Sequence, residues 1–177
     1  MRGFTLRPIR LAEVTAVRRL VQLYIYDLGG AYWDVESNGA FGSPGWHRRF
    51  WSRRGRHLFV MRVRGRLAGF VLVGARARFA GTGTRVIAEF FVLRKYRRRG
   101  VGSRGALDVL TRFPGRWELS ELDWNVAAQK FWRGIIRRVA VDGYTEGRRR
   151  HGDLVNVVQN FETSTTARPA RRARRRG

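Results

Sequence analysis

Two glycines separated by one residue, Gly100 and Gly102, follow three consecutive arginines and precede a segment with helical periodicity. Glycine allows the backbone to approach a bound group closely, because it has no side chain. The unpaired N–H groups at the start of a helix, together with the positive end of its dipole, attract anions. This segment therefore favours the binding of a phosphate or another anion.

The same segment excludes two common kinds of nucleotide site. It has no Gly-Lys-Ser/Thr sequence, which a Walker phosphate loop requires, and it lacks the six-residue glycine spacing of a Rossmann fold. Nucleotide hydrolysis and hydride transfer therefore lose their main support. A glycine at a helix start after a solvated basic run is also a common structural arrangement, so the residues by themselves indicate only an anion-binding α/β domain.

Glu89 is the residue best suited to acid–base chemistry. It is the only charged residue in Ile87 to Leu93, an apolar run typical of a central strand that is covered on both faces. Desolvation there favours the neutral form of a carboxyl group. It would therefore raise the pKa of Glu89 toward a value that suits a general base. An outward-facing Glu89, or one paired with an arginine, would have a structural role instead.

Several other chemistries are excluded or not expected. The chain has no cysteine, which excludes disulfides, a cysteine–zinc site and a thiol nucleophile. His47, His57 and His151 have no metal-ligand spacing, so we predict no metal. Ser103 has no sequence-adjacent histidine or acid to activate it, so a serine acyl-enzyme is not expected.

Apolar periodicity predicts an alternation of strands and helices. The segment from Ala31 to Arg56 has no clear pattern apart from a short helix near Pro44 to Trp51, and Arg76 to Arg85 is predicted to be a loop. The predicted strands are residues 4–10, 57–64, 66–75, 87–93, 117–124, 139–144 and 154–161, and the predicted helices are residues 11–28, 101–113 and 127–136.

Length and composition predict one globular domain over residues 1–162, followed by a disordered, arginine-rich tail over residues 163–177. The net charge of +24 comes from 37 Lys and Arg against 13 Asp and Glu. Such a charge suits a nucleic-acid partner, but it is also compatible with a biased genomic base composition. The first thirty residues are interrupted by arginines, and no apolar run approaches a membrane span, so we expect a soluble cytoplasmic protein without a membrane partner.

Two motifs resemble those of the GCN5-related N-acetyltransferase (GNAT) superfamily. The residues from Arg97 to Gly102 match its Gln/Arg-x-x-Gly-x-Gly/Ala signature, and Asn125 to Trp132 are similar to its Asn-x-x-Ala-x-x-Phe-Tyr segment. The predicted order of elements resembles the family from Phe4 to Phe161. The resemblance implies an α/β (α+β) fold with a mixed, mostly antiparallel central sheet that is flanked by helices and has splayed strands four and five.

The resemblance also implies acetyl-coenzyme A (acetyl-CoA) as the cosubstrate. Its pantetheine arm is expected along the fourth strand and its pyrophosphate on the basic loop, with a far wall after the fifth strand. The implied contacts are the backbone of Phe91, Val92 and Leu93, the loop residues Arg97, Arg98, Arg99, Gly100, Val101, Gly102 and Ser103, and the wall residues Asn125, Phe131 and Trp132.

The activity implied is direct transfer of an acetyl group to an amine in a ternary complex. A lysine-like amine has an ordinary pKa near 10.4, so a base must remove its proton, and Glu89 is the catalytic candidate. Trp132 stands where the family often has a tyrosine acid, which leaves Tyr144 or solvent as the proton source. The alternatives are a basic nucleic-acid-binding protein and a catalytically silent CoA-binding protein on the same scaffold.

The acceptor is expected to be an amine-bearing small molecule or peptide bound by the segment after the first helix. Acidic and aromatic side chains gather there, and they suit an amine. The predicted substrate-binding residues are Asp27, Tyr32, Trp33 and Asp34. Alternatively, these aromatics belong to the core and the acids are solvated. We expect a monomer or homodimer.

Overall fold

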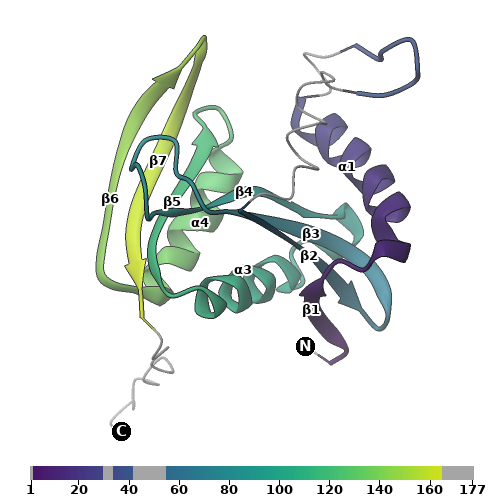
Figure 1. The fold of residues 1–177 in the computed structure, drawn as a ribbon, viewed down its shortest axis with the longest axis horizontal. Helices are drawn as coiled ribbons and strands as arrows, with labels where there is room; N and C mark the ends of the chain where they lie inside the picture. Colours follow the sequence, from purple (N-terminus) through teal and green to yellow (C-terminus); the bar gives the residue numbers. More distant parts are fainter. Residues whose placement is uncertain (1, 30–33, 42–54, 165–177) are drawn as a thin grey trace, which may run out of the picture. The chain divides into compact units, whose positions relative to one another are not determined.

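A computed structural model describes residues 2–29, 34–41 and 55–164. Strands and helices follow one another along these residues in the order that the periodicity predicts (Figure 1). In chain order they are β1 (Phe4–Pro8), the 3-10 helix η1 (Leu11–Glu13), α1 (Val14–Gly29), β2 (Arg56–Val63), β3 (Arg66–Gly74), β4 (Arg85–Val92), the 3-10 helix η2 (Arg94–Tyr96), α3 (Val101–Arg112), β5 (Gly115–Leu122), α4 (Val126–Val139), β6 (Ala140–His151) and β7 (Leu154–Thr163).

The seven strands are hydrogen-bonded in the order β1-β2-β3-β4-β5-β7-β6. β1 and β2, β5 and β7, and β6 and β7 pair antiparallel, whereas β4 and β5 pair parallel through Arg85↔Trp117 and Val86↔Glu118. A mixed, mostly antiparallel sheet with helices is therefore confirmed. The chain forms two compact units, and β4 contributes its first four residues to one unit and its last four to the other.

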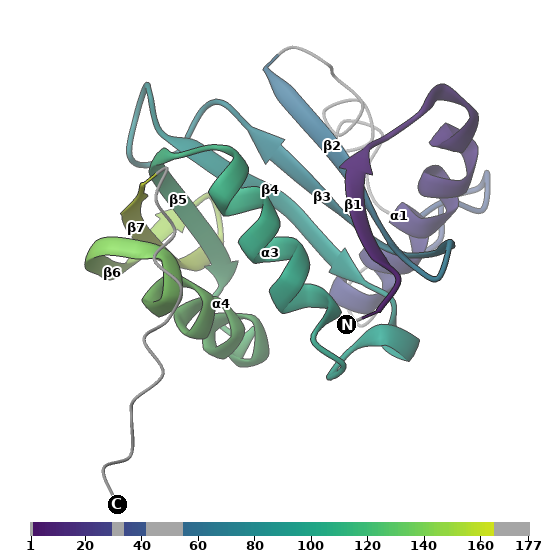
Figure 2. The ribbon, with the colours of Figure 1, turned by 90° about the horizontal axis from the view of Figure 1, so that it is seen from below.

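The first unit comprises Met1–Val73 and Glu89–Gly102. In it, β1 lies beside β2 at the edge of the sheet (Figure 2). The apolar residues of α1 recur every three or four positions, which places them on one face, and this face is buried. The core residues of the unit that are at most 2% exposed include Val17, Val21, Ile25, Val60, Met61 and Phe70.

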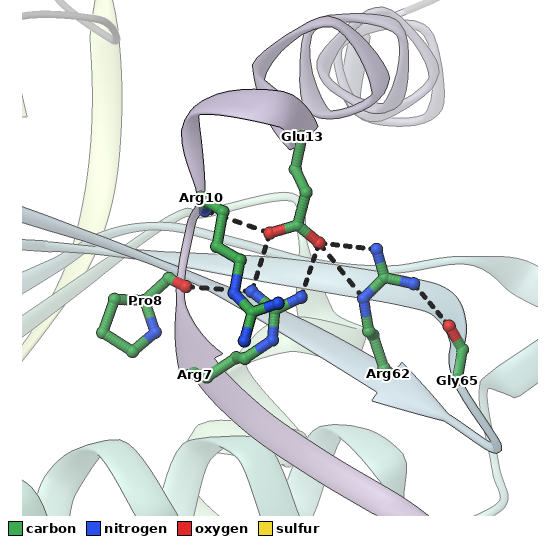
Figure 3. A network of polar contacts seen from close by, with 6 residues as sticks. All are labelled: Arg7, Pro8, Arg10, Glu13, Arg62 and Gly65. Carbon is green, nitrogen blue, oxygen red and sulfur yellow. Dashed lines mark hydrogen bonds and ion pairs between the residues drawn. The ribbon is translucent and has the colours of Figure 1, made fainter.

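Glu13 joins the start of α1 to the first two strands (Figure 3). Its carboxylate binds Arg7 at 2.7 Å and Arg62 at 2.5 Å, and the N–H of Arg10 donates to it at 3.0 Å. The hydrogen bond from Arg7, followed by those from Arg62 and Arg10, outweighs the effect of burial and lowers the pKa of Glu13 to about 2. Because the pKa is depressed in the folded state, this network stabilises the fold above about pH 4.5 and is lost as the pH falls toward 2.

The second unit comprises Gly74–Ala88 and Ser103–Gly177. β5 is paired along its whole length with β7, from Gly115↔Thr163 to Leu122↔Asn156, and β6 and β7 form a long hairpin that is green and yellow in Figure 1. Glu118 on β5 is 1% exposed, and its carboxylate accepts three consecutive backbone N–H groups, from Arg78, Phe79 and Ala80, at 2.9, 3.0 and 2.6 Å. This carboxylate fixes the loop that precedes β4.

Most predicted elements are found within a few residues of their expected ends. The clearest difference is β6, which continues to His151 rather than ending at Tyr144. Its additional residues pair with β7 at the edge of the sheet, where they are mostly exposed and polar, so they carry no alternating apolar pattern. The predicted helix near Pro44 to Trp51 and the tail from residue 165 lie outside the described residues. No helix among the described residues is long and apolar enough to cross a membrane.

Candidate functional site

Glu89 lies on β4 in the first unit, and its carboxylate is bound by a tyrosine from α1. The Tyr24 hydroxyl donates a hydrogen bond of 2.6 Å to Oε2 of Glu89, and both side chains are half-buried. The two residues are 65 positions apart in the chain. From the sequence, Tyr24 is one apolar position of a helix, and no local signal marks it as a partner of Glu89.

Aromatic packing fixes the ring of Tyr24. Phe70 contacts it edge-on, with ring centroids 5.7 Å apart, and the Phe91 ring is 5.6 Å away. Burial first, and then the negative charge of Glu89 and the hydrogen bond to it, raise the pKa of Tyr24 well above its ordinary value of 10. Tyr24 therefore keeps its proton at neutral pH and acts as the donor in this contact.

Arg97, the first residue of the glycine motif, turns back onto β4. Its Nε donates to the carbonyl of Val92 at 2.7 Å, its guanidinium carbon lies 5.5 Å from the centroid of the Phe91 ring, and its Nη2 binds Asp27. These contacts join the loop to the strand that carries Glu89.

Asp27 is engaged by two arginines of the first unit. Arg94 Nε donates to its Oδ1 at 2.8 Å, and Arg97 binds its Oδ2. Although burial raises the pKa of Asp27, the hydrogen bonds from Arg97 and Arg94 bring it below its usual value. The sequence predicted that Asp27 binds substrate, and that role stays a prediction, whereas its observed contacts connect α1 to the basic loop.

The loop itself has the backbone shape that its glycine suggests. Gly100 has a φ of 76°, in the left-handed region that glycine adopts without strain. Arg98 also lies in this region, with a φ of 58°. The exposed Arg98, Arg99 and Gly100 lead directly into α3, which has 12 residues. The N–H groups of its first turn, from Val101 onward, have no partner within the helix. These residues fit a pyrophosphate group, which would accept such N–H groups and face the arginines.

The backbone of β4 after Phe91 already makes contacts within the first unit. The Val92 carbonyl accepts the hydrogen bond from Arg97, and the Leu93 N–H donates to the carbonyl of Ala68 at 2.9 Å. Phe91 and Val92 are buried, and Leu93 is half-buried. A carbonyl oxygen has two lone pairs, so the hydrogen bond from Arg97 does not by itself exclude a ligand contact at Val92. The predicted pantetheine contacts at these residues stay a prediction.

The remaining predicted cosubstrate contacts belong to the second unit. Asn125 caps α4, because its Oδ1 accepts from the N–H of Ala128 at 3.2 Å. Phe131 and Trp132 lie on α4 with ring centroids 4.9 Å apart, and Trp132 is buried. Ser103 is half-buried in the first turn of α3. The capping bond gives Asn125 a structural function, and the cosubstrate contacts of these four residues stay predictions.

Of the predicted acceptor residues, Tyr32 and Trp33 lie outside the described residues. Asp34 is exposed and is followed by a short antiparallel bridge between Val35 and Phe41. His57 and His151 are exposed, and no group of three or more His, Cys, Asp or Glu in the described part of the chain could hold a metal.

A buried polar cluster in the second unit was not predicted. Glu121 on β5 is 7% exposed, and neither carboxylate oxygen has a hydrogen-bond partner among the described residues. Gln159 on β7 is fully buried, and its Nε2 donates to Glu146 at 3.1 Å, while Glu146 binds Arg133 at 2.7 Å. Burial, with a smaller contribution from the charge of Glu146, raises the pKa of Glu121 to about 7 although the Gln159 side chain opposes this shift.

This raised pKa predicts that the folded protein is more stable in mildly acidic solution than in alkaline solution. The folded state holds a proton on Glu121 between about pH 4.5 and 7 that the unfolded state releases, so stability declines as the pH rises through this window. Glu121→Gln should remove the decline and, at pH 8, raise the free energy of unfolding by roughly 3 kcal/mol relative to wild type. Urea unfolding at pH 5 and pH 8 measures it, with the exposed Glu162→Gln as control. An unchanged difference between the two pH values in Glu121→Gln would contradict the assignment.

The comparisons with known proteins agree with this fold. The model of the acetyltransferase (GNAT) family matches residues 24–135, which is more than half of the chain and includes Tyr24, Glu89 and the basic loop. No curated protein is similar enough to the chain for a significant match.

Three solved structures illustrate the similarity. A GCN5-related N-acetyltransferase from Kribbella flavida has a TM-score of 0.64 and 15% identity, covering 90% of this chain and 98% of its own. The ribosomal-protein-alanine N-acetyltransferase from Brucella melitensis has a TM-score of 0.61 and 14% identity, with coverages of 89% and 99%. A putative acetyltransferase from Salmonella typhimurium, solved with its cofactor acetyl-CoA, has a TM-score of 0.60 and 14% identity, with coverages of 96% and 99%. At these identities the likeness shows the fold.

Proposed function

Because this chain belongs to the acetyltransferase (GNAT) family, whose cosubstrate is acetyl-CoA, we propose that it transfers an acetyl group from acetyl-CoA to an amine by direct transfer in a ternary complex. The observation that carries this proposal is the arrangement of the site residues in the first unit. There, the left-handed loop at Gly100 and the half-buried carboxylate of Glu89 are joined by β4 and by the contacts of Arg97.

The basic loop would hold the cosubstrate by its pyrophosphate. The N–H groups of the first turn of α3 donate to the phosphate oxygens, and the exposed Arg98 and Arg99 neutralise their charge. Arg97 contributes indirectly, because its guanidinium binds Val92 and Asp27 and thereby fixes the start of the loop. Acetyl-CoA supplies an activated thioester carbonyl.

Glu89 would accept the proton that the amine must lose before or during its attack on this carbonyl. The C–N bond forms, the C–S bond breaks, and the thiolate of coenzyme A takes a proton from solvent or from a nearby acid. Tyr144, on β6 in the second unit, is the candidate acid that the sequence suggested. Trp132 cannot serve as that acid, since indole does not release its proton at physiological pH.

The test is a thiol-release screen of amines with acetyl-CoA, combined with calorimetric measurement of acetyl-CoA binding. Release of free coenzyme A that depends on one class of amine supports the proposal and identifies the acceptor class. Binding of acetyl-CoA without thiol release for any amine would indicate a catalytically silent protein. Strong, steeply salt-dependent binding of a DNA duplex without acetyl-CoA binding would favour the nucleic-acid alternative.

Asp34 is an exposed acid in the predicted acceptor segment, and we expect it to attract the charged amine. Because an exposed ion pair contributes up to about 1 kcal/mol, Asp34→Asn should raise the KM for the amine about fivefold and leave the affinity for acetyl-CoA unchanged. Asp27→Asn is the matched comparison, and its effect on the amine KM should be smaller, because Asp27 already binds Arg94 and Arg97. A larger effect on amine KM in Asp27→Asn than in Asp34→Asn would reverse this assignment.

A further inference from the structure

We propose that Tyr24 is a positioning residue for Glu89, whose carboxylate it holds in one orientation and stabilises in the charged form. The inference rests on the proposed role of Glu89 as the base. The O–H···O distance of 2.6 Å is in the range of a hydrogen bond to an ionised carboxylate, which is shorter and stronger than one between neutral groups.

Packing around Tyr24 holds its hydroxyl in one orientation. The residues on either side of it along the inner face of α1, Val21 and Ile25, are at most 2% exposed, and the rings of Phe70 and Phe91 contact its own ring. A glutamate has three rotatable side-chain bonds and loses considerable freedom when it is held in one geometry. A donor on an aromatic ring that is packed against Phe70 and Phe91 supplies such a geometry, because the packing restricts the ring.

Tyr24 holds the base and does not replace it. Its pKa is raised well above 10, so it remains protonated and can donate to Glu89 but cannot take a proton from an amine. One turn further along the same face of α1, Asp27 holds Arg94 and Arg97. Substitution of the Tyr24 hydroxyl leaves these three charged groups in place.

Tyr24→Phe removes the hydroxyl and keeps the ring. Without the donated hydrogen bond, the charged form of Glu89 is less favoured, so its carboxyl group should titrate at a higher pH than in wild type. The carboxylate is also less well oriented for proton transfer. We therefore expect kcat to fall roughly 10- to 100-fold, with the acid limb of the pH–rate profile at higher pH. The Kd for acetyl-CoA should change less than about twofold, since the loop is untouched.

The direct experiment follows the carboxyl group of Glu89 by carbon-13 NMR in glutamate-labelled protein, with its resonance identified by loss in Glu89→Gln. Tyr26→Phe is the matched control, because Tyr26 lies on the same helix but is 55% exposed and its ring packs against that of Phe41. The titration midpoint should rise in Tyr24→Phe and stay at the wild-type value in Tyr26→Phe. An unchanged midpoint in a folded Tyr24→Phe protein overturns the inference.

A double-mutant cycle of turnover separates positioning from a structural effect. If Tyr24 acts through Glu89, the combined Tyr24→Phe and Glu89→Gln variant should be no slower than Glu89→Gln alone. Multiplication of the two single effects would overturn the inference, as would wild-type kcat and pH profile in Tyr24→Phe. Absence of thiol release by the wild-type protein would remove the proposed function, while the NMR titration would still decide whether Tyr24 governs the charge of Glu89.

Discussion

Glu89→Gln should lower kcat by roughly 10²–10⁴-fold while the affinity for acetyl-CoA changes little. Glutamine keeps the size of the side chain and an oxygen that can accept the hydrogen bond from Tyr24, but it cannot take up a proton. The variant should therefore fold with its packing intact, and its loss should appear in turnover. Steady-state kinetics with an identified amine, together with calorimetry of acetyl-CoA binding, measures both quantities.

The pH dependence gives this prediction a second readout. In the wild-type enzyme, activity should fall on the acid side as Glu89 becomes protonated, and this limb of the profile should disappear in Glu89→Gln. Glu162→Gln, at an exposed position of β7, makes the same chemical change away from the site and should keep the wild-type profile. If Glu89→Gln retains wild-type turnover and profile, deprotonation belongs to an ordered-water relay or to bulk solvent.

Features that are contiguous in the sequence could be predicted from it. The strand that carries Glu89, the basic residues and glycines after it, and the start of α3 at Val101 form one uninterrupted segment whose residue types determine its local conformation. The positive φ of Gly100 follows from the same logic, since glycine adopts this conformation without strain. The apolar face of α1 could also be predicted, because the spacing of its apolar residues matches the period of a helix.

Contacts between distant residues could not be predicted in this way. The local sequence predicts Asp27 as a substrate ligand, which stays a prediction, and it gives no sign of the two arginine partners, which lie 67 and 70 positions away. Tyr24 was one more apolar position of a helix until the fold brought Glu89 to its hydroxyl. Glu121 belongs to the same class, because its raised pKa depends on burial among other elements, which no local pattern encodes.

Gly100→Asp should reduce the affinity for acetyl-CoA at least 100-fold while the protein remains folded. The aspartate carboxylate would lie where the loop receives a phosphate, and the juxtaposition of like charges in a binding site costs several kcal/mol, of which each 1.4 kcal/mol is a factor of ten. The fold should tolerate the change, because Gly100 is exposed and aspartate enters the left-handed region more readily than most residues. Calorimetry gives the affinity, and thermal unfolding confirms the fold.

Gly100→Asn separates the charge from the backbone strain. Asparagine has nearly the same shape as aspartate and adopts the left-handed conformation at a similar cost, but it is neutral. Strain at the φ of 76° should therefore weaken acetyl-CoA binding equally in both variants, and the additional loss in Gly100→Asp measures repulsion between the carboxylate and the phosphate. High salt should reduce this additional loss, because it screens exposed charges. Equal affinities in the two variants would assign the effect to loop geometry, and wild-type affinity in folded Gly100→Asp would place the pyrophosphate elsewhere.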